Sequence, residues 1–187
     1  MNIIELFLTA AETYPNKVAI QDPKTSITYK ALRIAIQETA AYYTKKGISQ
    51  NDRVLVFVPL SVNLYIHVLA IFYIGATAVF LDEWTNKSRL ENCCKTANCK
   101  GFVGSWKAQC LRFFSKPLKK IPIRLNTTSR MEENLPPKQM STEQSALITF
   151  TTGSTGTPKA ADRTHGFLIA QYEACLLYTS PSPRDRG

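Results

Sequence analysis

The residues best suited to chemistry lie in one short stretch near the carboxyl end of the sequence. An apolar run at 146–150 leads into a loop that contains two glycines, five hydroxyl side chains and, after a proline, a lysine. The loop positions are Thr151, Thr152, Gly153, Ser154, Thr155, Gly156, Thr157 and Lys159. Glycine lets the backbone approach an anion closely, and backbone N–H groups, hydroxyls and an ammonium group supply donors and positive charge. The stretch therefore predicts a site for a polyphosphate.

This loop differs from the Walker A phosphate loop, in which the lysine directly follows the second glycine. Here Lys159 lies three residues after Gly156 and is followed by Ala160. A flexible turn is the alternative for glycines and hydroxyls taken alone. The strand before the loop, the Pro158–Lys159 pair and the later Thr164–His165 pair argue against that alternative.

The elements that must position the loop follow from the hydrophobic periodicity. Helical spacing predicts helices at 2–13, 29–46, 62–74 and 85–97, and short strands are expected at 18–20 and 26–28. Continuous apolar runs at 53–58 and 77–81, with a shorter one at 102–103, are typical of buried parallel strands. The alternation of strand and helix predicts an α/β fold, with a mainly parallel sheet flanked by helices. A helix resumes near His165.

The length and net charge of the chain limit the number of domains and the kinds of partner that can be expected. The chain has 187 residues and a net charge of +9, which suits one domain and raises the question of an anionic partner. Between 84 and 130 there are eleven lysines and arginines and one acid, Glu91, with Trp106, Phe113 and Phe114 interleaved. No RNP, helix-turn-helix or zinc-finger signature accompanies them, so we expect no nucleic-acid partner. The alternatives are a solvated basic face, attraction of anionic substrates, or peripheral contact with a membrane surface.

The rest of the basic, loop-rich stretch, 84–143, shows little periodicity. Four prolines between 111 and 143 predict a surface connection there, with a short strand near 121–123. The cysteines are Cys93, Cys94, Cys99, Cys110 and Cys175. Because their spacing matches no standard zinc pattern, we expect reduced thiols and no metal site. The apolar run at 62–74 is too short to span a bilayer, and no signal peptide is evident, so we expect a cytoplasmic protein.

The phosphate loop and two upstream blocks resemble the adenylate-forming, AMP-binding superfamily, which includes acyl-CoA synthetases, peptide-synthetase adenylation domains and luciferases. The stretch from Thr149 to Lys159 is similar to the family's signature loop, and Thr164–His165 follows as it does there. The segment at 27–32 resembles an early motif, and 51–82 resembles a longer block. The resemblance covers about 1–174. Departures are Ala160 for the usual glycine, Phe80 for a proline and Glu83 for another proline.

The resemblance implies an ATP-dependent ligase that converts a carboxylate to an acyl adenylate, and many members of the family then transfer the acyl group to coenzyme A. It implies that Thr151 to Thr157 cradle the β- and γ-phosphates and that Lys159 is catalytic and neutralises their charge. His165 would then lie near the acyl site, or alternatively make a structural hydrogen bond at a helix start. We expect His67 to be a core residue. An acyl-CoA synthetase of fatty-acid metabolism is preferred to a peptide synthetase, because the sequence starts at the domain start.

Later motifs of the family, including those for adenine, ribose and the Mg²⁺ ligand, are not in the sequence. We therefore expect an incomplete N-terminal portion of the large domain, inactive by itself. A non-catalytic nucleotide-binding module is the alternative, and a basic nucleic-acid-binding protein is a weaker one. The string from Cys175 to Asp185 reads as the translation of a transposase-based sequencing adapter. We therefore expect 1–174 to be native and 175–187 to be a non-native tail.

Overall fold

The computed structural model describes residues 1–81, 93–94, 96–152 and 158–179. Within this part of the chain, two strands form an antiparallel ribbon and six form the main sheet. The ribbon consists of β1 (Val18–Gln21) and β2 (Ser26–Thr28). The main sheet comprises β3 (Arg53–Phe57), β4 (Thr77–Phe80), β5 (Gly101–Gly104), β6 (Ile123–Asn126), β7 (Ser145–Thr152) and β8 (Pro158–Thr164). The helices are α1 (Ile4–Thr13), α2 (Tyr29–Lys45), α3 (Val62–Tyr73), α5 (Trp106–Phe114), α6 (Lys116–Lys120) and α7 (His165–Thr179).

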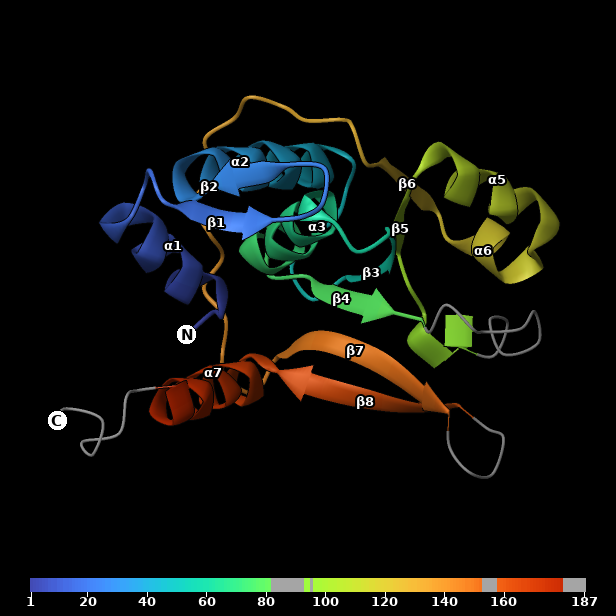
Figure 1. Cartoon of the computed structure of the whole chain (residues 1–187). Coiled ribbons are helices and arrows are strands. Elements are labelled where there is room, and N and C mark those ends of the chain that lie inside the picture. Colours follow the sequence, from blue (N-terminus) through green and yellow to red (C-terminus); the bar gives the residue numbers. More distant parts are fainter. Residues whose placement is uncertain (82–92, 95, 153–157, 180–187) are drawn as a thin grey trace, which may run out of the picture.

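The main sheet has the strand order β6-β5-β3-β4-β7-β8 (Figure 1). Neighbouring strands from β6 to β7 run parallel, and β8 returns antiparallel to β7 at the edge. The structure thus confirms the α/β class with a mainly parallel sheet flanked by helices.

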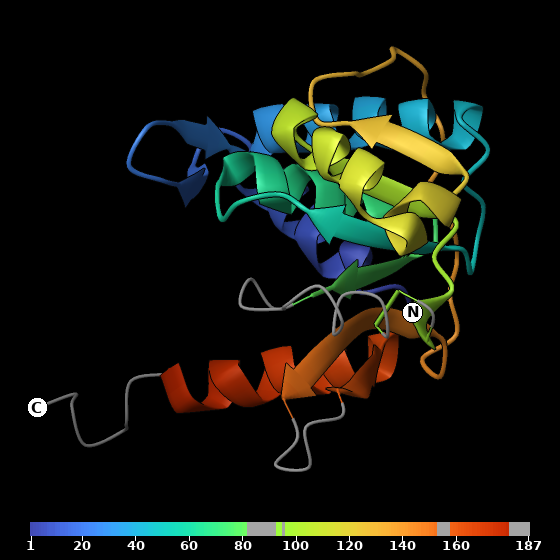
Figure 2. The same ribbon diagram turned by 90° about the vertical axis from the view of Figure 1, so that its right-hand side faces the viewer.

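Helices cover both faces of the sheet, and each face has its own core. Val54 and Val56 point to a core shared with α1, α2 and α3, whereas Leu55 points to a second core that includes α5 and α6. Figure 2 shows α5 and α6 next to β6 when the molecule is viewed from that side. The burial of both strand faces explains why the central strands read as continuous apolar runs.

Helix boundaries follow local signals that are visible in the sequence. The Thr28 hydroxyl accepts a hydrogen bond from the Ala31 N–H at 3.3 Å, and the Ser61 hydroxyl accepts one from the Leu64 N–H at 3.3 Å. These contacts satisfy N–H groups that the first turns of α2 and α3 leave without helical partners. After α3, Gly75 has a φ of +69°, and a Cβ there would lie 2.6 Å from the Met140 sulfur. A side chain at this position would therefore strain the turn into β4.

Two parts of the sequence prediction were wrong. Residues 111–120, the first part of the predicted surface connection 111–143, complete α5 and then form α6, because buried Leu118 and Ile121 pack into the second core. The rest of that prediction is confirmed, since the strand β6 lies close to the expected 121–123 and no helix or strand occupies 127–143. The strand β8 was not predicted, since its polar residues lack apolar alternation; pairing with β7 supplies its backbone hydrogen bonds. Most of the helix expected at 85–97 lies outside the described residues, although Cys93, Cys94, Thr96 and Ala97 are helical. Among the helices that are described, none is long and apolar enough to cross a membrane.

Candidate active site

The predicted phosphate loop connects β7 to β8 in the sequence. Thr151 pairs with Lys159 and Thr152 pairs with Pro158 across the two strands. The strand therefore extends two residues further than expected, and Thr151 and Thr152 belong to β7. The remaining loop positions, Gly153, Ser154, Thr155, Gly156 and Thr157, lie outside the described residues.

Polar contacts fix the register of this hairpin. The Thr77 hydroxyl donates to the Ser145 carbonyl at 3.0 Å, which joins the base of β7 to β4. The Arg163 guanidinium donates to the Thr149 hydroxyl at 2.6 Å across the hairpin. The Ser145 hydroxyl likewise donates to the Asp162 carboxylate. The strand β8 has few apolar side chains, so burial alone would specify its register on β7 only weakly. Side-chain hydrogen bonds therefore fix this register.

Lys159 lies near the turn, directly opposite Thr151, and its side chain is exposed. The structure thus places Lys159 beside the predicted loop, as the phosphate-binding hypothesis requires. The role of Lys159 in catalysis stays a prediction.

His165 occupies a different place. It is the first residue of α7, after the far end of β8, and it is fully buried. Because β8 spans seven residues at about 3.3 Å each, His165 and Lys159 are separated by roughly 20 Å. The structure therefore does not bring these two predicted site residues together.

The surroundings of His165 favour the structural alternative. The Ile3 N–H donates to its Nδ1 at 3.3 Å, and the ring meets Phe72 edge-on, with 6.1 Å between centroids. Burial, assisted by the nearby Met1 ammonium, lowers its pKa to about 4, although Glu5 opposes this shift. The neutral imidazole connects the N-terminal segment to α7 through this hydrogen bond. It carries no positive charge that could attract a phosphate.

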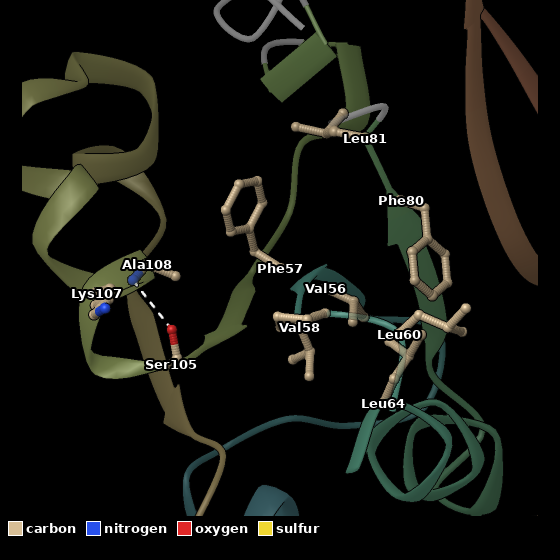
Figure 3. A pocket seen from close by; sticks show the side chains of 11 residues that line it. Val56, Phe57, Val58, Leu60, Leu64, Phe80, Leu81, Ser105, Lys107 and Ala108 are labelled. Atoms are coloured by element: carbon tan, nitrogen blue, oxygen red, sulfur yellow. Dashed lines mark hydrogen bonds between the residues drawn. The ribbon is translucent and has the colours of Figure 1, made fainter. Parts of the chain in front are cut away.

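A second feature of the same sheet edge is an apolar pocket, which the sequence analysis missed (Figure 3). The carboxyl ends of β3, β4 and β5 meet there, and β7 ends beside β4, with Thr149 paired to Phe80. The pocket has a volume of about 410 Å³ and is lined by Val56, Phe57, Val58, Pro59, Leu60, Leu64, Phe80, Leu81, Ser105, Lys107 and Ala108. Ligands of open α/β sheets bind at this kind of edge.

Two polar residues distinguish this pocket from ordinary core. The Ser105 hydroxyl accepts a hydrogen bond from the Ala108 N–H at 3.4 Å and caps the start of α5, and Lys107 lies two residues further along the chain. The arrangement suits a ligand with an apolar portion and an anionic group nearby. The sequence did contain a signal for this pocket. Several predicted parallel strands end at a common edge of the sheet, and a serine at the start of a helix follows one of them.

The other groups considered from the sequence belong to the core. His67 is 1% exposed, and its Nδ1 lies 2.7 Å from the Tyr43 hydroxyl, which confirms it as a core residue, although its Nε2 has no hydrogen-bond partner among the described residues. Burial raises the pKa of Cys94 to about 11 and that of Cys99 to about 12, so both remain thiols. In the described ranges no three His, Cys, Asp or Glu residues are grouped to hold a metal ion.

A parallel sheet whose carboxyl edge carries both a glycine- and hydroxyl-rich hairpin and an apolar pocket defines an α/β protein built to bind a ligand at that edge. The model of one family, the AMP-binding enzymes, matches residues 7–186, and the chain belongs to this family. This result confirms the resemblance found in the sequence.

The curated relatives include peptide synthetases. The chain is 29% identical over 184 residues to the nonribosomal peptide synthetase GRA1 of Gibberella zeae, covering 96% of the chain and 2% of the relative. It is 28% identical over 187 residues to an L-proline–[L-prolyl-carrier protein] ligase of Pseudomonas fluorescens, covering 93% of the chain and 37% of the relative. The chain thus spans well under half of these relatives. The preference for an acyl-CoA synthetase over a peptide synthetase stays a prediction.

Solved structures share the fold. The O-succinylbenzoate coenzyme A synthetase of Bacillus subtilis, in complex with AMP, matches with a TM-score of 0.82 and 17% identity over 94% of the chain and 46% of that structure. The ATP-bound MatB of Rhodopseudomonas palustris matches with a TM-score of 0.82 and 19% identity, covering 95% of the chain and 37% of that structure. These matches show that the chain has the fold of the N-terminal part of adenylate-forming enzymes.

Proposed function

We propose that the full-length protein activates a small carboxylate with ATP. The carboxylate oxygen attacks the α-phosphorus, the bond from that phosphorus to the bridging oxygen breaks, and pyrophosphate leaves with the electron pair. The products are an acyl adenylate and pyrophosphate. The observation that carries the proposal is the signature-like loop sequence of this family between the paired strands β7 and β8.

In this proposal the backbone and hydroxyls from Thr151 to Thr157 hold the β- and γ-phosphates, and Lys159 offsets the charge that develops on the leaving pyrophosphate. Donors that are already in place stabilise such charge without reorganisation at the moment of reaction. The described residues provide no cluster for Mg²⁺. We therefore assign no step to the metal in this chain and expect its ligand in a later motif of the full-length protein.

We further propose that a thiol accepts the acyl group, with coenzyme A as the first candidate. Coenzyme A joins a slender, weakly polar arm to anionic phosphates, and the edge pocket joins apolar walls to Lys107. A carrier-protein thiol is the second candidate, favoured by the similarity to a carrier-protein ligase. A soluble enzyme of the cytoplasm accords with either acceptor.

Pyrophosphate exchange into ATP tests the adenylation step. The full-length protein should catalyse exchange with at least one member of a carboxylate panel that includes fatty, aromatic and amino acids. Lys159→Ala should lower the rate about 100-fold or more, which is the usual cost of removing a positioned charge-stabilising donor. Lys24→Ala, an exposed lysine in the β1–β2 turn, is the matched control and should leave the rate unchanged. Absence of exchange with every carboxylate, or full activity of Lys159→Ala, would refute the proposal.

The acceptor is tested separately. With the preferred carboxylate, release of AMP should depend on added coenzyme A, and Lys107→Ala should raise the KM for coenzyme A while leaving pyrophosphate exchange intact. If only a carrier protein supports AMP release, the second candidate replaces the first.

We also propose that the 187-residue chain alone forms no adenylate and that residues 175–187 are a non-native tail. The side chains at 173–177 of α7 are all exposed, so the core does not depend on the end of this helix. Resequencing of the genomic locus tests the second point. A stop codon directly after Gly187 in genomic DNA would overturn it, and adenylate formed by the isolated chain would overturn the first.

A further inference from the structure

The helix α5 turns its apolar stripe outward. Trp106, Cys110, Phe113 and Phe114 are all exposed, at the i, i+4, i+7 and i+8 positions that share one side of a helix. The three aromatic side chains are between 68% and 80% exposed. A surface helix ordinarily directs this stripe to the core. The outward stripe on α5 is therefore a candidate interaction surface.

The inner side of α5 is already occupied. Ala108 is buried beside Gly104 of β5, and the Gln109 amide donates to the Leu125 carbonyl of β6 at 3.1 Å. These contacts fix the orientation of the helix on the sheet. The exposed aromatics are consequently presented by a rigid support, and rotation of α5 to bury them would break the contacts with both strands.

Lysines occur on the same two adjoining helices, α5 and α6. Lys107 lies on α5, and Lys116, Lys119 and Lys120 lie on α6, all with exposed side chains. From 96 to 130 the sequence contains no acidic residue. None of these four lysines pairs with a carboxylate among the described residues, where the ion pairs of this region are Lys100–Asp52 and Arg130–Glu38. We call the four lysines together with Trp106, Cys110, Phe113 and Phe114 the basic aromatic face.

We propose that the basic aromatic face docks the protein onto an anionic lipid membrane. An interfacial helix inserts an apolar stripe among the acyl chains while flanking cations meet the headgroups, and this combination occurs here on adjoining helices. Its convex helical stripe favours a lipid surface over a nucleic-acid strand, whose binding uses aromatic platforms along a groove. Figure 1 shows α5 and α6 beside β5 and β6, away from α7.

Vesicle sedimentation of the chain tests this proposal. The protein should sediment with vesicles of phosphatidylcholine and phosphatidylglycerol, and much less with phosphatidylcholine alone. The triple variant Trp106→Ala, Phe113→Ala, Phe114→Ala should lower the partition coefficient about tenfold or more. The triple variant Lys116→Gln, Lys119→Gln, Lys120→Gln should lower it to a similar extent and weaken its dependence on salt. Circular dichroism should show all variants folded, because every substituted side chain is exposed.

Two matched triples separate docking from general stickiness. Phe167→Ala, Tyr172→Ala, Leu176→Ala removes three exposed apolar side chains from α7, and Lys24→Gln, Lys30→Gln, Lys138→Gln removes three exposed lysines elsewhere. Neither should change partitioning. In a Trp84→Phe background, Trp106 emission should shift to the blue on binding to the anionic vesicles.

Four results would overturn the proposal. Equal binding to neutral vesicles would remove the role of the lysines, and an equal loss in the α7 triple would indicate non-specific adhesion. Binding without a shift of Trp106 emission would exclude insertion. Binding of a single-stranded oligonucleotide that is lost in the aromatic triple, with no binding to vesicles, would assign the face to nucleic acid instead.

Discussion

The central strands and the β7–β8 hairpin belong to one sheet but are held in place by different forces. In β3, Val54, Leu55 and Val56 are buried, with neighbouring residues facing opposite cores. In β8, Lys159, Ala160 and Asp162 are exposed, and polar contacts fix the register. Burial of apolar side chains therefore stabilises the central strands, whereas the proposed phosphate loop joins two strands at the edge of the sheet. We expect stability and activity to respond to different substitutions.

The largest loss of stability is expected in the centre. Phe102 of β5 is fully buried and meets Phe57 with 6.4 Å between ring centroids. Phe102→Ala removes this packing and leaves a cavity, so the free energy of unfolding should fall by about 3–5 kcal/mol. Urea denaturation followed by circular dichroism measures this change.

Phe167→Ala in α7 is the control for that measurement. This side chain is 54% exposed, and its loss should change the free energy of unfolding by about 0.5 kcal/mol or less. If the two substitutions cost the same, the distinction between a packed centre and a lightly held edge is wrong.

A loss of stability of intermediate size is expected at acidic pH, because two histidines are buried in different parts of the molecule. His67 packs in the core between α2 and α3, and His165 lies where the hairpin meets α7. Burial lowers the pKa of each to about 4 from an ordinary value of 6.5. The unfolded chain therefore binds protons first, so stability is full above pH 6.5 and falls as the pH decreases toward 4, by about 2–3 kcal/mol for each histidine.

The two contributions can be measured apart. Urea denaturation between pH 7.5 and pH 5 should show a shallower pH dependence in both His67→Gln and His165→Gln than in the unmodified chain. If His165→Gln leaves the slope unchanged, that imidazole is not held neutral, and the joint between α7 and the N-terminus is looser than the structure indicates.

The same comparison explains what the sequence could predict. The central strands were found because burial on both faces requires apolar residues such as Val54 to Val56. The strand β8 was missed because its sequence lacks the apolar alternation of a strand. Its backbone is held instead by hydrogen bonds to its partner β7. The pocket was missed for a related reason: Phe57, Phe80 and Lys107 are distant in sequence and meet only because parallel strands end at a common edge.

Sequence reasoning placed the loop and Lys159 from local motifs, yet it could not decide the place of His165. The sequence around a histidine at a helix start is the same whether its side chain faces a ligand or accepts a hydrogen bond from a backbone N–H group. The structure adds that β8 separates His165 from Lys159 and that Ile3 approaches it from the other end of the chain, while a role of His165 at the acyl site stays a prediction.

The smallest loss of stability, with a disproportionate loss of activity, is expected at the edge. Arg163→Ala removes the 2.6 Å hydrogen bond to the Thr149 hydroxyl and should cost about 1 kcal/mol of unfolding free energy. Because this contact fixes the register of the strands that flank the loop, pyrophosphate exchange by the full-length protein should fall about tenfold or more through misplacement of the phosphate donors.

Arg33→Ala is the matched control for this last substitution. Arg33 lies on the surface of α2 and pairs with Glu12 at 3.4 Å, a solvated contact worth at most about 0.5 kcal/mol. It should alter neither stability nor exchange. If Arg163→Ala costs as much stability as Phe102→Ala, the hairpin is part of the cooperative core. If exchange is unchanged although the hydrogen bond is lost, loop placement depends on the backbone pairing of β7 and β8 alone.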